Sequence, residues 1–449
     1  MSERKLSRRQ VLKALGIGAA GVTLAACQPQ VVEKVVEKEV TREVEVKAAP
    51  KKPVTVRFMC RAGEQGQQQR IFADQWNEMH PEIQIKKEEA AWGDLATKVE
   101  AQAATGTLAD LVFQVIWWFP YLAHKGVWLA LDDLIAANDP GMDDFFPWAI
   151  EVCTWGGKIR ALPGAVHPGK ANLVYNKTLL EEKGVPLPTL DWTWDDWTQA
   201  ALDVTDRDKG IWGTVGAIGA TETDANNFRY FDGNIFNYEG TKMELDTENT
   251  LECLKLQRDR IVEMHVSPLA EEMTSSAKEN FMTGIIGLLQ NNIDAVGFAE
   301  AIGDKFEWGI MILPKGPRGT RGSMAFANQF VIYSKSKVPQ ETFAFLSFLT
   351  GPTGAKWLPL MIGKQPMGRK SAWEDPEVLK KWPHYGLINE HIFSKGVKPF
   401  PMPANTRFLE FEDTYTNEIR GIYQGNQTIE DQLPVVIEKC QKVLDLPLP

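Results

Sequence analysis

Aromatic and amide side chains gather directly after a predicted strand, where they are placed to contact a ligand. Residues 110–113 form this strand, and Gln114, Trp117 and Trp118 lie just beyond its carboxyl end. Flat indole faces suit the apolar faces of pyranose rings, and amides suit sugar hydroxyls. The sequence contains 15 tryptophans, most of which are individually better explained as core or capping residues. We nevertheless expect at least one indole of this pair to line a sugar-binding cleft.

Four further side chains are candidates for the same cleft. Trp92 follows a second predicted strand, residues 83–85. Asn328 and Gln329 precede a predicted strand over residues 330–333. Arg369 is placed to pair with a ligand hydroxyl or with an acid across the cleft, and a surface salt bridge is the alternative.

Motifs that would indicate catalysis or metal binding are missing from the sequence. Beyond the predicted signal of residues 1–26 it contains no G-x-S-x-G, P-loop, G-x-G-x-x-G, H-E-x-x-H or C-x-x-C pattern, and its six histidines are scattered. We therefore predict no catalytic residues, no metal site and no cofactor. An exported glycan hydrolase is the strongest rival, because it also needs an aromatic groove and a pair of carboxylates. The chain has 59 acidic residues, so carboxylate pairs are found easily, and their presence does not distinguish a hydrolase from a binding protein.

The elements that must position these side chains alternate between strand and helix. Strands are predicted over residues 54–59, 83–85 and 110–113, with helices over 71–79 and around 95–104 between them. This order predicts an α/β fold with a mostly parallel sheet covered by helices on both faces. Ligands of such sheets bind at the carboxyl ends of the strands. Further on, a capping box at Thr193 to Asp196, a helix opened by Pro339 and an amphipathic helix over residues 429–444 are expected.

The first 26 residues read as an export signal. A basic stretch with Arg8 and Arg9 precedes an apolar run, residues 14–26, that is too short to span a membrane. The paired arginines resemble a twin-arginine signal, and residues 24–27 (Leu-Ala-Ala-Cys) resemble a bacterial lipobox. We expect lipidation at Cys27 and anchoring of the mature protein at the outer face of the cell membrane. An ordinary secretory signal with an incidental cysteine is the alternative.

The segment that follows, residues 27–53, is rich in Val, Glu and Lys and carries no aromatic residue, so it predicts a tether. The formal net charge of −10 becomes −14 once the signal, with five basic residues and one acidic residue, is removed. So acidic a protein is a poor nucleic-acid binder. Four widely spaced cysteines remain, for which disulfides and buried free thiols are both open. They are Cys60, Cys153, Cys253 and Cys440.

A series of short blocks in fixed order resembles the family 1 extracellular solute-binding proteins, the group that includes maltose-binding protein. The resemblance runs from about Val54 to about Ser371. Its blocks are residues 54–59, 72–81, 103–112, 126–133, 157–163, 173–177, 281–284, 312–317 and 344–354. Ala109 replaces a proline that is usual in the family, and Ile293 stands near the position of a stacking tryptophan.

The resemblance implies two α/β lobes joined by hinge strands, a periplasmic-binding-protein-like fold. The N-terminal lobe would comprise residues 54–163 and 314–350, and the C-terminal lobe residues 168–310 and 352–449. It also implies polar ligand contacts after the first strand, at Glu64 and Gln65, and in the second lobe at Asn291, Asn292 and Asp294. The implied function is solute capture for an ABC importer, by a monomer that closes around a small molecule and docks on membrane permease subunits. A carbohydrate is the expected solute, and a polyamine is the main alternative within this class.

Overall fold

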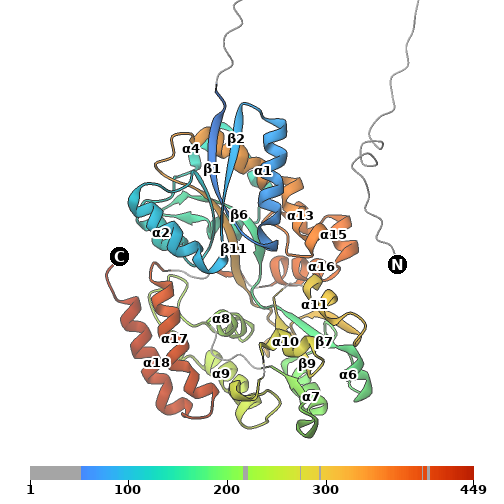
Figure 1. Cartoon of the computed structure of the whole chain (residues 1–449). Coiled ribbons are helices and arrows are strands. Elements are labelled where there is room, and N and C mark those ends of the chain that lie inside the picture. The colour runs from blue at the N-terminus through green and yellow to red at the C-terminus, as the bar shows by residue number, and fades with distance from the viewer. Residues whose placement is uncertain (1–51, 216–220, 274, 293–294, 397, 402–404) are drawn as a thin grey trace, which may run out of the picture. The chain divides into compact units, whose positions relative to one another are not determined.

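The computed structural model describes residues 52–215, 221–273, 275–292, 295–396, 398–401 and 405–449 (Figure 1). The predicted signal peptide and Cys27 lie outside the described residues, as do Asp294 and all but the last two residues of the predicted tether.

The first sheet begins with the three strands expected near the start of the mature chain. Strand β1 (Val54–Arg61) pairs in parallel with β2 (Ile83–Ala90) and with β3 (Leu111–Val115). Helices α1 (Gln67–Met79) and α2 (Leu95–Thr105) connect them, so the predicted β-α-β-α-β order is confirmed. The carboxyl ends of the three parallel strands therefore meet at one edge of the sheet.

Strands from later in the chain complete this sheet. Strand β11 (Met324–Ile332) is antiparallel to β3 and to β6 (Ala161–His167), and the short β12 (Phe400–Pro401) pairs in parallel with β11. Strand β11 begins six residues before the predicted strand, because pairing with β6 continues as far as Phe326 opposite His167. Asn328 and Gln329 therefore lie inside the strand, and the prediction that they precede it is wrong.

The second sheet is built from four strands in the order β10-β7-β9-β8. Strand β7 (Asn172–Asn176) is antiparallel to both β10 (Trp308–Ile312) and β9 (Ile286–Asn291), whereas β8 (Trp212–Thr214) is parallel to β9. Figure 1 shows β7 and β9 among helices other than those around β1 and β2. Each sheet thus has its own covering helices.

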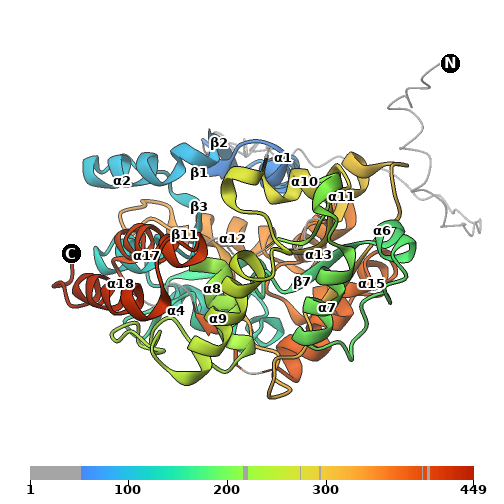
Figure 2. The same cartoon turned by 90° about the horizontal axis from the view of Figure 1, so that it is seen from below.

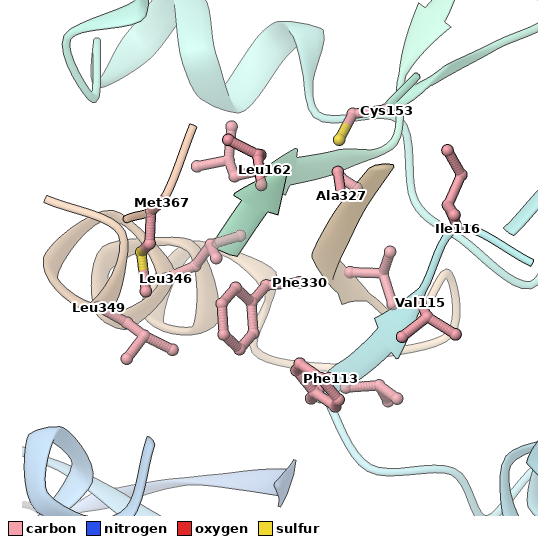
Figure 3. Packing of buried hydrophobic residues seen from close by; sticks show 14 of the residues in the cluster. Phe113, Val115, Ile116, Cys153, Leu162, Ala327, Phe330, Leu346, Leu349 and Met367 are labelled. Atoms are coloured by element: carbon pink, nitrogen blue, oxygen red, sulfur yellow. The ribbon is translucent and has the colours of Figure 1, made fainter. Parts of the chain in front are cut away.

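Two large apolar cores belong to the two sheets. In the first, Phe330 of β11 meets Phe113 of β3 with ring centroids 5.7 Å apart, and Leu346 and Leu349 of α12 (Pro339–Leu349) approach from the side (Figure 3). In the second, α7 (Trp194–Val204), α9 (Glu248–Val262), α17 (Phe408–Tyr423) and α18 (Ile429–Leu444) pack together. Helices α17 and α18 lie side by side in both views (Figures 1 and 2). The remaining α-helices are α3 (Phe119–His124), α4 (Asp132–Ala137), α5 (Pro147–Glu151), α6 (Lys177–Glu182), α8 (Thr221–Tyr230), α10 (Ala277–Met282), α11 (Ala295–Ile302), α13 (Pro352–Ile362), α14 (Lys370–Trp373), α15 (Pro376–Lys381) and α16 (His384–Ile388).

The predicted helix ends and cysteine states can be checked directly. The capping box at the start of α7 is confirmed, with Thr193 and Asp196 exchanging hydrogen bonds. The four cysteines of the described chain are buried and free, which decides between the two open alternatives. Burial raises the pKa of the Cys60 thiol to about 11 and that of the Cys153 thiol to about 12, so neither is reactive at neutral pH.

The chain changes core in the stretch between β6 and β7 and again between β10 and β11. Gly169 lies in the first of these connections with φ +78°, and a Cβ there would come within 2.8 Å of Asn226 Oδ1. Residues 352–449, predicted as one part of the second lobe, divide between the cores. Residues of α13 to α16 pack in the first core, whereas Phe400, α17 and α18 pack in the second. The lobe boundaries themselves remain a proposal, and these cores favour a third connection near residue 400 rather than residue 350.

Candidate ligand-binding site

A cavity of about 290 Å³ lies where the edge of the first sheet faces the second lobe. The three parallel strands contribute to the wall from their carboxyl ends: Arg61 ends β1 and Gln65 follows it, Trp92 follows β2, and Trp117 follows β3. This placement follows the general rule for α/β sheets, in which loops at the carboxyl ends form the ligand site. The second lobe contributes Glu222 and Asn292. Strands β6 and β11 and the segment after α13 supply the remaining wall.

One wall of the cavity is aromatic. The rings of Trp92 and Trp117 meet edge to face with centroids 6.1 Å apart, and Trp117 contacts Phe326 in the same way at 5.6 Å. His167 stacks on Phe326 at 4.2 Å. Such a continuous surface of flat rings offers an apolar face to a ligand while leaving polar groups at its margins.

Amide side chains form much of the polar wall, and neighbouring bonds hold two of them in place. Gln69 accepts a hydrogen bond from the backbone N–H of Arg61 at 2.9 Å, which ties α1 to the end of β1. Gln68 donates to the carbonyl oxygen of Gly354 and links α1 to α13. Together with Gln65, Asn292 and Asn328, these residues supply both donors and acceptors to a polar ligand.

Burial or contact with an aromatic ring affects three ionisable side chains of the cavity. Burial lowers the pKa of His167 to about 4, and its Nδ1 accepts the backbone N–H of Gly169 at 3.1 Å. The ring is therefore neutral at pH 7, with its proton on Nε2. Burial raises the pKa of the Glu222 carboxyl, an effect that Lys170 opposes. Arg61 lies with its guanidinium 4.2 Å from the centre of the Trp92 ring.

The structure brings five of the twelve predicted ligand contacts together in this cavity. They are Gln65, Trp92, Trp117, Asn292 and Asn328. Glu64 is exposed beside Gln65 and does not line the cavity. Asn291 lies at the end of β9, half-buried and next to Asn292, but it also stays outside the cavity wall. Asp294 lies outside the described residues.

Gln114 and Gln329 do not face the cavity, because they hydrogen-bond to each other inside the sheet. Strand β3 continues to Val115, so Gln114 lies within the strand and opposite Gln329 of β11. Both side chains are fully buried, with Gln114 Nε2 donating to Gln329 Oε1 at 3.1 Å and Gln329 Nε2 donating to Val152 O at 2.7 Å. Since side chains alternate along a strand, Asn328 points to the cavity face and Gln329 to the other face.

Trp118 and Arg369, two further predicted ligand contacts, also lie outside the cavity. Trp118 is buried and borders a separate hollow of about 180 Å³ that α17 closes on its other side. Arg369 is 1% exposed, lies 4.1 Å from the Phe145 ring centre and forms an ion pair with Asp144 at 3.3 Å. The expectation that Arg369 reaches a ligand or the facing lobe finds no contact to support it, because Phe145, Asp144 and backbone carbonyls of residues 140, 141 and 350 surround its side chain.

Several cavity residues were missed by reasoning from the sequence. Arg61 is the last residue of β1, so the carboxyl-end rule would have identified it had the strand been extended by two residues. His167, Glu222 and Lys364 carry no comparable signal, because they reach the cavity only through the packing of distant segments.

Within the residues that the structure describes, neither a metal-binding cluster nor a membrane-spanning helix is found. No group of three or more His, Cys, Asp or Glu side chains there is arranged to hold a metal ion. No helix in the same part of the chain has both the length and the apolar character needed to cross a bilayer.

Comparison with known proteins places this fold and cavity in context. A putative binding protein of Brucella abortus is 26% identical over 284 residues, which are 60% of this chain and 65% of that protein. An arabinooligosaccharide-binding protein of Halalkalibacterium halodurans is 24% identical over 227 residues, 48% of each protein. The chain thus matches less than two thirds of the length of these curated relatives.

Solved structures and a family model cover more of the chain. An ABC substrate-binding protein from Listeria monocytogenes, in complex with cycloalternan, superposes with a TM-score of 0.75 at 19% identity, covering 88% of this chain and 100% of that one. This likeness confirms the predicted two-lobed α/β fold. The family model described as bacterial extracellular solute-binding protein matches residues 63–356. Since this match spans well over half of the sequence, the chain belongs to the family of bacterial extracellular solute-binding proteins.

Proposed function

We propose that this protein captures a carbohydrate in the cavity between its lobes and delivers it to the permease of an ABC importer, without chemically altering it. The observation that carries the proposal is the continuous aromatic wall of Trp92, Trp117 and Phe326 beside amide side chains. Stacked rings and amides together match the apolar faces and hydroxyls of a sugar. The names of the arabinooligosaccharide-binding relative and of the cycloalternan complex support the same class of ligand.

The size of the cavity fits a short ligand. Its volume of about 290 Å³ is at the lower end of the range of roughly 300–1,000 Å³ found for small-molecule sites. The proposed function also includes closure of the two lobes. The sugar binds the closed state more tightly than the open state and so shifts the population towards the closed state. The closed monomer would then dock on the permease.

A calorimetric and thermal-shift screen of residues 53–449 tests this function. We expect sugars to bind, whereas polyamines and peptides should leave the melting temperature unchanged. A ligand at one hundred times its Kd stabilises the native state by about 2.7 kcal/mol. Closure should also reduce the radius of gyration in solution scattering. Tight binding of a polyamine or peptide with no response to sugars would contradict the proposal, and release of sugar hydrolysis products would show an enzyme instead.

We further propose that the protein is exported by the signal in residues 1–26 and anchored through acylated Cys27. This rests on the order of paired arginines, apolar run and lipobox in the sequence. Dual acylation of a new N-terminal cysteine gives stable membrane attachment, whereas a tether of alternating charge gives none.

The variant Cys27→Ala is expected to abolish this anchoring. In cell fractionation the wild-type protein should sediment with membranes, and the variant should appear either in the soluble fraction or as an uncleaved precursor. Mass spectrometry of the wild-type protein should show a lipid-modified N-terminal cysteine. A Cys27→Ala protein that is processed identically and remains membrane-bound would disprove the anchor.

A further inference from the structure

The guanidinium of Arg61 is a cation without an acidic partner in the wall of the cavity. It stacks on Trp92 at 4.2 Å, and within the described residues no carboxylate lies at ion-pair distance from it. Two nearby arginines are paired, since Arg57 of β1 bonds to Glu88 and Arg70 of α1 lies 3.5 Å from Glu89. Arg61 is half-buried, and this burial lowers the pKa of its guanidinium.

Two further groups of the cavity wall, the Trp117 indole and the His167 ring, offer N–H donors. Indole Nε1 of Trp117 is a donor only, and it is buried without a hydrogen-bond partner among the described residues. His167 carries its ring proton on Nε2 because Nδ1 accepts the N–H of Gly169. Together with Arg61 these two groups favour a ligand that presents a strong acceptor beside the hydroxyls that the cavity amides can bind.

One acid lies among the described residues of the cavity wall, and it is not at ion-pair distance from Arg61. Glu222 is the single carboxyl among the described residues of the wall, and burial disfavours its ionised form. Lys170 lies close enough to Glu222 to oppose that effect, and its Nζ donates to Thr223 at 2.7 Å. The unpaired guanidinium of Arg61 is thus a local positive charge in a chain of formal net charge −10.

We propose that the cavity selects an acidic sugar, a uronic acid or a short oligosaccharide that bears one, with the ligand carboxylate paired to Arg61. This inference rests on the proposed carbohydrate function and narrows its substrate class. The planar guanidinium presents parallel N–H groups that match a carboxylate in two hydrogen bonds. The indole of Trp92 holds that plane in place, while Trp117 offers its face or its N–H to the sugar ring.

Matched pairs of disaccharides test the proposal, each pair differing only in a carboxylate or a hydroxymethyl group at C6. The panel contains glucuronate, galacturonate and mannuronate disaccharides with their neutral counterparts, titrated by calorimetry at low and at moderate salt. The acid of at least one pair should bind tenfold or more tightly than its counterpart, since hydrogen bonds to charged groups contribute about 1.5–3 kcal/mol. Its affinity should fall as salt rises.

The variant Arg61→Gln should remove this preference, lowering the ratio of acid to neutral-sugar affinity about tenfold or more, whatever its effect on the neutral sugar alone. Lys335→Gln is the matched control, because it removes the same charge from an exposed position outside the cavity and should change neither affinity. Melting of each unliganded variant verifies the fold.

Neutral sugars that bind as tightly as their acidic counterparts, or an Arg61→Gln variant that weakens both equally, would overturn the acidic-sugar assignment and leave the carbohydrate function standing. Failure of every sugar, acidic or neutral, beside binding of a different solute would overturn the carbohydrate function as well.

Discussion

Replacing Trp117 by alanine is expected to lower the affinity for sugar by about thirtyfold or more, corresponding to a loss on the order of 2 kcal/mol. The indole lines the cavity, meets Trp92 and Phe326 edge to face, and carries an N–H that has no partner in the described part of the chain. Truncation therefore removes both the flat surface and a donor. Calorimetric titration of the variant with the sugar found in the solute screen measures the effect.

The neighbouring residue provides the control. Trp118 is 7% exposed and does not line this cavity, so Trp118→Ala should leave affinity within about threefold and instead reduce the free energy of unfolding by about 3–5 kcal/mol. Trp117→Phe keeps a ring but loses the N–H, and its affinity should fall between those of the wild type and Trp117→Ala. Equal affinities for Trp117→Ala and the wild type would show that the indole only packs.

The fold was predictable from the sequence wherever local pattern and tertiary pairing agree. The strands β1, β2 and β3 and the helices between them follow from apolar runs and helical periodicity, and α12 and α18 from their Pro339 start and amphipathic spacing. The ends of the strands were harder to predict from the sequence. Polar residues such as Gln114 suggest that a strand has ended, yet pairing with β11 carries β3 on to Val115.

The site was predictable to the extent that it follows the carboxyl-end rule. Gln65, Trp92 and Trp117 were found because each directly follows a parallel strand. Gln114 and Gln329 were misjudged because a buried amide pair across two strands satisfies their polarity. No local pattern distinguishes such a pair from two amides that face a ligand. His167 and Glu222 depend on contacts between the lobes, which a single sequence does not specify.

The contacts of Arg369 are likewise not specified by the sequence around it, and they are important for the stability of the fold. Its side chain donates from Nε to Thr350 O at 2.6 Å and from Nη1 to Gly141 O at 3.2 Å, and it also reaches Pro140 O and Asp144. It thereby ties the loop before α5 to the end of α12. The sequence around Arg369 shows a charge after a turn, but it does not show that three backbone carbonyls converge on that charge.

We expect Arg369→Met to reduce the free energy of unfolding by about 3–5 kcal/mol, the range found when one member of a buried ion pair is removed. Methionine fills much of the volume but leaves Asp144 and the carbonyl oxygens without their donor, and the loss is measured by urea denaturation. Arg318→Met is the matched control. Its pair with Glu252 is 40% and 42% exposed, and exposed pairs contribute only about 0–1 kcal/mol. Because Arg369 lies outside the cavity, the affinity of folded Arg369→Met for sugar should stay within about threefold of the wild type. A stable variant that has lost sugar binding would return Arg369 to the ligand site, as its sequence position first suggested.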